Sequence, residues 1–289
     1  MGKFVKISIS MGNVWDRTTD FLGDHLSMIV PVALLAIVFP SALSTLIEPV
    51  ARSGASAAVM VNLAALILGI VGIWGQLFVV ALALQPGAGR SAAMRVAGAR
   101  LLPLIGIIVI LMLAVFALML PVPIALIATG FDMRAAMINP QPSVSLAAGW
   151  FITVYLIVLI PLMIFVTARL LLLTSVIVAE RRGIGAIRRS FALTRGMVWK
   201  IIGVTILYGI VVLVAMMAAR TVFGSVLRIV LGGEGLITPA TVLTAVVLAI
   251  VQAIFVVLAS AFCAKLYLAV RDAREPAESA LHQPTAESA

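Results

Sequence analysis

Charged residues are scarce in this sequence, and their scarcity excludes an ordinary soluble domain. Only 11% of the 289 residues are charged and 63% are hydrophobic, and the mean hydropathy is +1.24. In a typical soluble domain roughly a quarter of the residues are charged. So few charges cannot cover a water-exposed surface, and we therefore expect lipid to surround most of the chain.

Cysteine and histidine are scarce as well, which excludes two common kinds of site. Cys263 is the only cysteine, so the chain can form neither an internal disulfide nor a cysteine-based metal site. The two histidines are His25 and His282, and the sequence contains no HExxH, GxSxG or paired-carboxylate arrangement. We therefore predict that the protein is not an enzyme and that it uses no cofactor or metal.

The sequence does contain six long apolar segments. Each has about 20 residues or more, the length that a helix needs to cross the ~30 Å hydrocarbon layer of a bilayer. They predict an all-α, polytopic membrane protein in which residues 1–272 form a single integral membrane domain. The predicted transmembrane helices are Leu26–Leu46, Ala57–Leu84, Leu101–Ile127, Leu146–Val178, Val198–Val222 and Ile237–Val270.

The basic residues predict the orientation of the chain. A net charge of +9 suggests nucleic-acid binding in a soluble protein, but here Lys and Arg lie between the apolar segments, where the positive-inside rule places them. With the N-terminus in the cytoplasm, the only basic residues in outer loops are Arg52, Arg134, Arg220 and Arg228. We therefore predict a bacterial plasma (inner) membrane protein with both termini cytoplasmic, no cleaved signal peptide and no nucleic-acid partner.

The transmembrane helices come in pairs, and each pair follows a segment with a helical pattern. These connectors are Ile7–His25, Ser91–Arg100 and Ile184–Met197. The arrangement predicts three tandem two-helix repeats with amphipathic interfacial connectors, related by an axis along the membrane normal. Residues 273–289 are rich in Ala, Glu, Ser and Pro and have no apolar period, which predicts a disordered cytoplasmic tail.

The third connector has the pattern of a basic helix that lies in the headgroup plane. Ile184, Ile187 and Phe191 fall on one side of it, and the arginines lie mostly elsewhere. Near an anionic surface each basic residue contributes about 1 kcal/mol to binding. An ordinary positive-inside loop has the same composition, so lipid recognition and simple orientation both remain open. The candidate contacts to anionic lipid or a partner are Arg181, Arg182, Arg188, Arg189 and Arg195.

Arg169 lies at the end of an apolar segment, where its depth decides its role. From Leu146, about 20 residues at about 1.5 Å each bring the helix to the far interface near Phe165, so we expect Arg169 at headgroup level. The apolar stretches Leu170–Val178 and Ala261–Val270 then extend beyond the bilayer, and we expect them to pack on the connectors as a compact cytoplasmic base. No Asp or Glu lies at mid-depth, which argues against an ion-coupled carrier.

Small and uncharged polar residues inside the apolar segments are expected to pack helices together. Gly69, Gly72 and Gly75 permit close approach of a neighbouring helix. Polar side chains in transmembrane helices usually hydrogen-bond between helices, each for about 0.6 kcal/mol. The uncharged polar residues inside the apolar segments are Asn62, Gln76, Tyr155, Tyr208 and Gln252.

Four segments of the sequence resemble a known family. They are ISMGNVWDRTTDFLGDHLSMIVPVALL from Ile9, GRSAAMRVAGARLLPLIG from Gly89, ARLLLLTSVIVAERRGIGAIRRSFALTRGMVWKIIG from Ala168 and KLYLAVRD from Lys265. With them the chain resembles the YciC-like bacterial inner-membrane proteins and the related glycerophosphoryl diester phosphodiesterase membrane-domain family over nearly all of residues 7–271. The third segment is the most specific, because Arg169, Glu180, Arg189, Ser190 and the Leu193–Gly196 turn match that family's pattern.

The resemblance implies a six-helix membrane domain without an assigned reaction. In multidomain relatives a separate soluble barrel hydrolyses the glycerophosphodiester, and the chain has no room for that barrel. The resemblance therefore implies no catalytic residue. It leaves Arg169 and Glu180 as candidates for structural ion pairing, with Glu180 able to pair with the basic connector.

Together these features predict an envelope-associated scaffold or a membrane domain that binds lipid or a partner protein. The alternative is a small permease or channel whose pathway runs along the pseudo-threefold axis. Polar residues around a water-accessible cavity favour the alternative, and a tightly filled bundle centre favours the scaffold. An accessory membrane module for a separately encoded phosphodiesterase is a third possibility.

Overall fold

The computed structural model describes residues 10–132, 144–180, 183–232 and 238–281, and these residues form helices joined by turns, without a strand among them. The predicted all-helical architecture is confirmed, as is the number of helical segments long and apolar enough to cross a membrane, which is 6. The segments are Met11–Ser53, Ala55–Leu84, Pro86–Ala128, Leu146–Glu180, Val198–Leu231 and Pro239–Arg274.

The first segment is a composite helix. The Ser10 side chain caps its N-terminus by accepting a hydrogen bond from the Asn13 backbone N–H at 3.5 Å. Pro31 lies inside the helix and has no N–H to donate, and a π-helical turn follows it. The elements of this segment are α1 (Met11–Ala33), η1 (Leu34–Val38), α2 (Phe39–Ile47) and η2 (Glu48–Ser53).

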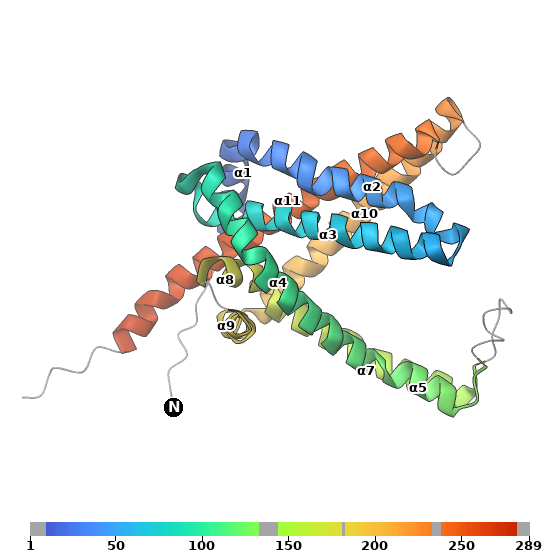
Figure 1. The fold of residues 1–289 in the computed structure, drawn as a ribbon. Helices are drawn as coiled ribbons and strands as arrows, with labels where there is room; N and C mark the ends of the chain where they lie inside the picture. The colour runs from blue at the N-terminus through green and yellow to red at the C-terminus, as the bar shows by residue number, and fades with distance from the viewer. Residues whose placement is uncertain (1–9, 133–143, 181–182, 233–237, 282–289) are drawn as a thin grey trace, which may run out of the picture.

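In chain order the remaining helices are α3 (Ala55–Leu84), η3 (Pro86–Ala88), α4 (Gly89–Met119), α5 (Pro121–Ala128), α7 (Leu146–Leu170), α8 (Leu173–Glu180), α9 (Gly185–Leu193), α10 (Val198–Leu231) and α11 (Pro239–Leu281). The long ones among them, α3, α4, α7, α10 and α11, alternate in direction between two ends of the molecule (Figure 1). Helix α3 packs on α2, α4 and α11, and α10 runs along α11. Helices α4 and α5 run with α7 as a separate arm that diverges from α2, α3 and α11 (Figure 1).

The three connectors are not equivalent in the structure. The described part of the first connector and the whole second connector lie within α1 and α4, and each of these helices continues without a break into the apolar segment that follows. The third forms α9, which a turn separates from α10. This turn contains Gly196 at φ +86°, a left-handed conformation that glycine adopts without strain. The three-repeat arrangement therefore stays a prediction.

Helix α11 continues to Leu281, past residue 273, where the sequence predicts the start of a disordered tail. Ala, Arg and Glu are strong helix formers and make up most of residues 273–280. Extending an existing helix also avoids the cost of nucleating a new one. Helix α11 thus runs through residues 273–281, Pro276 included, and residues 282–289 lie outside the described residues. The disordered tail stays a prediction.

The best-packed part of the molecule lies at one end of the bundle. Residues 77–83 of α3 are buried on every side, so this part of α3 lies at the centre of the core. Around it, Leu172, Val176 and Ile177 are fully buried, as are Leu266 and Tyr267 of α11. The apolar stretches Leu170–Val178 and Ala261–Val270 therefore pack into a compact base, as predicted.

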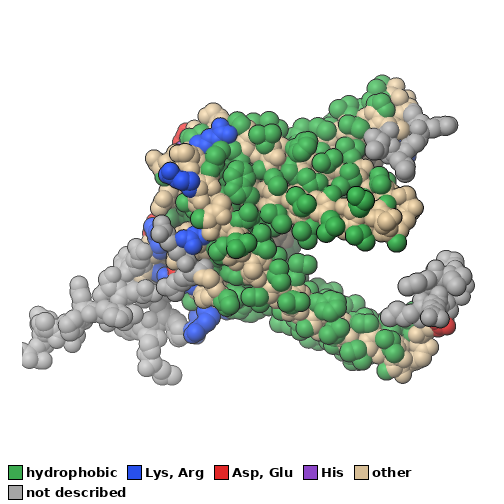
Figure 2. Space-filling model, viewed as in Figure 1, with side chains coloured by type: hydrophobic (Ala, Val, Ile, Leu, Met, Phe, Trp, Pro, Cys, Tyr) green, Lys and Arg blue, Asp and Glu red, His purple; other side chains and the backbone are tan. Residues whose placement is uncertain are grey.

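We call this part of the molecule the basic end, and it comprises residues 11–25, 81–100, 169–180, 183–200 and 261–274. Figure 2 shows Lys and Arg side chains gathered here. Hydrophobic side chains cover the sides of the arm formed by α4, α5 and α7 and the sides of the other helices, from which this arm diverges. Among those exposed apolar residues are Leu113 at 63%, Ile157 at 66% and Leu207 at 64%. Such lateral surfaces are suited to contact with lipid.

Candidate functional site at the basic end

Glu180, the last residue of α8, links three elements of the basic end. Its Oε1 accepts a hydrogen bond from Arg189 Nε of α9 at 2.9 Å and another from the Tyr267 hydroxyl of α11 at 3.1 Å. The Glu180 side chain is 16% exposed, so water screens the ion pair only in part. Glu180 thus lies against the basic connector, as the sequence suggests, and also contacts α11, which the sequence does not reveal.

Arg169 connects α7 to α9 through the backbone. Its Nη1 donates a hydrogen bond to the Phe191 carbonyl at 2.9 Å, and the Ser190 hydroxyl donates to the Arg169 carbonyl at 2.7 Å. The guanidinium also lies over the rings of Phe165 and Phe191, at 5.1 and 5.8 Å from their centroids. Among the described residues Arg169 forms no ion pair. A backbone carbonyl and two rings take the place of the ion pair expected from the sequence.

Arg274 holds the end of α9 against α11. Its Nη2 donates hydrogen bonds to the carbonyls of Leu193 at 3.2 Å and Arg195 at 3.0 Å. The last carbonyls of a helix lack intrahelical donors and carry partial negative charge, so a cation there is stabilising. The side chains discussed so far thus serve mainly to hold the helices together.

Lys265 performs a similar role between α11, α3 and α1. Its ammonium group donates a hydrogen bond to the Ala83 carbonyl at 3.0 Å and lies 4.6 Å from the centroid of the Phe21 ring. Because α3 ends at Leu84, the Ala83 carbonyl is one of the last of that helix. Lys265 therefore ties the end of the central helix to its neighbours.

The candidate arginines of the third connector have different environments. Arg188 is exposed, Arg189 is paired with Glu180, and Arg195 accepts from Arg274 through its carbonyl. Arg181 and Arg182 lie outside the described residues.

The buried face of α9 differs from the predicted one. It consists of Ala186, Ser190 and Leu193. Ile184 is 67% exposed, because the contact with α7 selects the face that carries the Ser190 hydroxyl. Since Ile184 and Arg188 are four residues apart, an apolar and a basic side chain lie together on the outer face of this segment.

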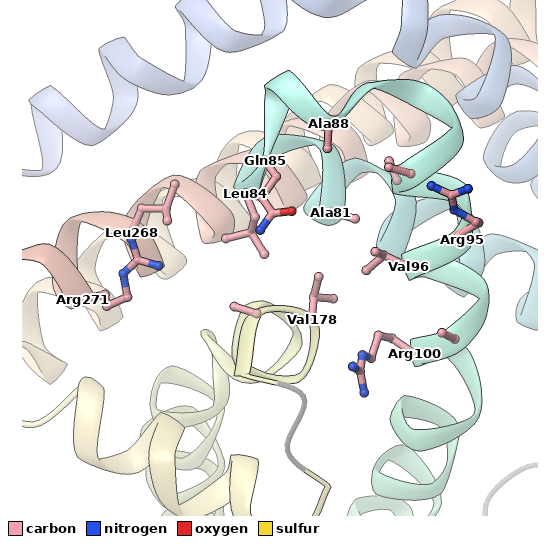
Figure 3. Close-up of a pocket in the computed structure, with 14 residues that line it drawn as sticks. Ala81, Leu84, Gln85, Ala88, Arg95, Val96, Arg100, Val178, Leu268 and Arg271 are labelled. Carbon is pink, nitrogen blue, oxygen red and sulfur yellow. The ribbon is translucent and has the colours of Figure 1, made fainter.

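A partly open cavity of about 520 Å³ lies between the ends of α3, α4, α8 and α11. Arg95 and Arg100 of α4 and Arg271 of α11 line it (Figure 3), and no Asp or Glu is among the described residues of the lining. The rest of the lining is largely apolar and includes Leu84 and Val178. Sequence reasoning missed this cavity, because the positive-inside bias marks the arginines but not the cavity that they line.

In the part of the chain that the structure describes, no group of three or more His, Cys, Asp or Glu side chains is placed to hold a metal ion. Asp16, Asp20 and Asp24 form an exposed row on α1, and a row of carboxylates does not converge on one ion.

Two of the polar side chains inside the apolar segments hydrogen-bond between helices. The Tyr155 hydroxyl of α7 donates to the Leu118 carbonyl of α4, and the Tyr208 hydroxyl of α10 donates to the Phe255 carbonyl of α11 at 2.6 Å. This is the packing role predicted for them. The three amides in the same group of residues lie on exposed helix surfaces: Asn62, Gln76 and Gln252.

Comparison of the chain with protein-family models, with curated proteins and with solved structures finds no match in any of the three. The functional proposal therefore rests mainly on the fold and on the residues of the basic end.

Proposed function

We propose that the protein is a non-catalytic integral membrane scaffold of a bacterial plasma membrane, and that its basic end faces the cytoplasm and binds anionic lipid of the inner leaflet. One observation carries this proposal. Exposed side chains just before α9, on α9 and in the first turn of α10 are both apolar and basic. Ile184 and Trp199 are 67% and 83% exposed, and Arg188 and Lys200 are exposed as well.

We call these four residues the interfacial strip. Tryptophan is enriched at the level of the lipid headgroups, and basic side chains beside apolar ones are typical of helices that lie at this level. Two cations near an anionic surface contribute about 2 kcal/mol in total. The interfacial strip therefore combines a tryptophan typical of headgroup level with the positive charge that an anionic leaflet attracts.

A scaffold is favoured over a permease by what the polar groups do. Glu180, Arg169, Lys265 and Arg274 are all engaged in contacts between helices at the basic end. Ion-coupled carriers need ionisable groups at membrane depth, and the acidic residues that the structure describes lie outside the six predicted transmembrane helices. The proposal also includes membership of the YciC-like family, which rests on the resemblance of the four sequence segments. It further includes an unidentified envelope protein as a partner.

The proposal is tested by the lipid that surrounds the protein. The chain is extracted from its membrane with a styrene–maleic acid copolymer, which keeps neighbouring lipid in place, and the ratio of anionic to zwitterionic lipid is measured by mass spectrometry. We expect enrichment of anionic lipid over the bulk membrane. The Arg188→Gln/Lys200→Gln variant should reduce this enrichment, because it removes both cations of the interfacial strip.

The matched control is Arg52→Gln/Arg220→Gln, which removes the same charge from exposed positions away from the basic end. It should leave the enrichment unchanged. A lipid composition equal to that of the bulk membrane, or an equal effect of both variants, contradicts the proposal.

A further inference from the structure

We infer that the cavity between α3, α4, α8 and α11 is a binding site for one phosphate group, supplied by the headgroup of an anionic lipid. The inference rests on the proposed function, since it takes the basic end to lie at the lipid headgroups. The inference goes beyond the proposed function because the cavity is a defined site for a single ligand and contains no residue of the interfacial strip.

Charge is the first argument. Three guanidinium groups line the cavity from two helices, Arg95 and Arg100 from α4 and Arg271 from α11, without a carboxylate in the lining (Figure 3). Like charges repel, so an anion that binds among guanidinium groups lining one cavity is stabilised by them. Guanidinium is also the side-chain group whose planar fork best matches the oxygens of a phosphate.

The availability of these groups is the second argument. Within the described ranges, Arg95 and Arg100 have no hydrogen-bond or ion-pair partner, unlike the arginines that tie α7, α9 and α11 together. Arg271 donates from Nη2 to Asp272 Oδ1 at 3.1 Å, and this carboxylate is not part of the lining. Arg95 and Arg100 are thus the side chains best placed to bind a ligand.

The shape and remaining lining of the cavity point to a lipid. Its volume of about 520 Å³ lies within the roughly 300–1,000 Å³ of typical small-molecule sites. Leu84, Val96, Val178 and Leu268 form apolar parts of the wall. A phospholipid presents an anionic phosphate next to an apolar glycerol-linked chain region, and this combination matches arginines beside apolar side chains at the end of a helix bundle.

The test measures binding of dioctanoyl phosphatidylglycerol to the purified full-length chain in neutral detergent by native mass spectrometry. We expect one tightly bound lipid per chain. The Arg95→Gln/Arg100→Gln variant should weaken binding roughly 25-fold, because each basic residue near an anionic group changes affinity by about fivefold. The control Arg17→Gln/Arg90→Gln removes the same charge from exposed positions outside this cavity and should change affinity less than about twofold.

A second variant separates the site from general electrostatics. Ala99 lines the cavity, and Ala99→Phe fills part of it without changing the net charge. We expect it to weaken binding tenfold or more, whereas a purely electrostatic attraction predicts no change. The reactivity of Cys263 in each variant shows whether the fold is intact.

Two further ligands identify the source of the phosphate. If a large excess of inorganic phosphate leaves the bound lipid in place, the ligand is a lipid headgroup, as inferred. If inorganic phosphate displaces it completely, the site recognises phosphate itself and the lipid assignment is wrong. Equal binding of dioctanoyl phosphatidylcholine, or equal losses in the cavity and control variants, overturns the inference.

The experiments distinguish failure of the proposal for the interfacial strip from failure of the inference for the cavity. Loss of the single bound lipid in the cavity variant, with unchanged enrichment of surrounding anionic lipid, supports the cavity alone. Loss of enrichment in the Arg188→Gln/Lys200→Gln variant with normal single-lipid binding supports the strip alone.

Discussion

Helix α3 comes close to the π-helical turn η1 at Gly75. A Cβ atom at this position lies 2.8 Å from the Ala36 Cβ and 3.0 Å from the Ile37 Cγ1. Non-bonded carbon atoms are at their optimum at about 3.5–4.0 Å, so Gly75→Ala forces the two segments apart by several tenths of an ångström. Over-packing of this kind costs about 1–3 kcal/mol, while alanine stabilises the helix itself by about 1 kcal/mol relative to glycine.

The expected result is a net loss of about 0–2 kcal/mol in the free energy of unfolding of Gly75→Ala. The matched control is Gly69→Ala on the same helix, where a Cβ meets nothing within 4 Å. This control lacks the clash, so the two variants should differ by about 1–3 kcal/mol. Each is unfolded by titration with sodium dodecyl sulfate in mixed micelles, and the half-buried Cys263 reports exposure through its reaction with a thiol dye. Equal stabilities of the two variants refute the close approach of α3 and η1.

Two further effects are expected in the same assay. Glu180→Gln removes the carboxylate that accepts hydrogen bonds from Arg189 and Tyr267, and it should destabilise the protein by about 1–2 kcal/mol. The exposed Glu48 is the control, and Glu48→Gln should change stability by less than about 0.5 kcal/mol; a smaller effect at Glu180 than at Glu48 contradicts the role of the ion pair. Tyr208→Phe removes one hydrogen bond between α10 and α11 and should cost about 0.6 kcal/mol, and an unchanged stability argues against that bond.

Sequence reasoning is most successful where a single segment carries the whole signal. The length and apolarity of each transmembrane helix are local properties, and the predicted helices agree with the structure apart from their ends. The ends differ because connector and transmembrane helix join without a break in α1 and α4. A change from polar to apolar residues marks the membrane boundary but does not interrupt the backbone hydrogen bonds of a helix.

The candidate site shows the limits of the same reasoning. The sequence identifies Glu180 and the arginines of the third connector as structural or surface groups, yet Tyr267 and Arg274 lie far from them in the chain and contact them only after folding. The glycines give a similar example. The spacing of Gly69, Gly72 and Gly75 suggests close packing at each, and only at Gly75 does a neighbouring side chain come within 3.0 Å of the added Cβ.

The sequence by itself determines the solvent, the secondary structure and the segregation of charge in this protein. Hydrophobicity over about 20 residues is sufficient to place a helix in lipid, and the positions of Lys and Arg between these helices are fixed by the order of the residues. The tertiary structure decides which of those cations form contacts between helices and which line a cavity. That choice depends on how α4, α8 and α11 meet at the end of α3, and contacts between residues so distant in the chain form only when the helices pack.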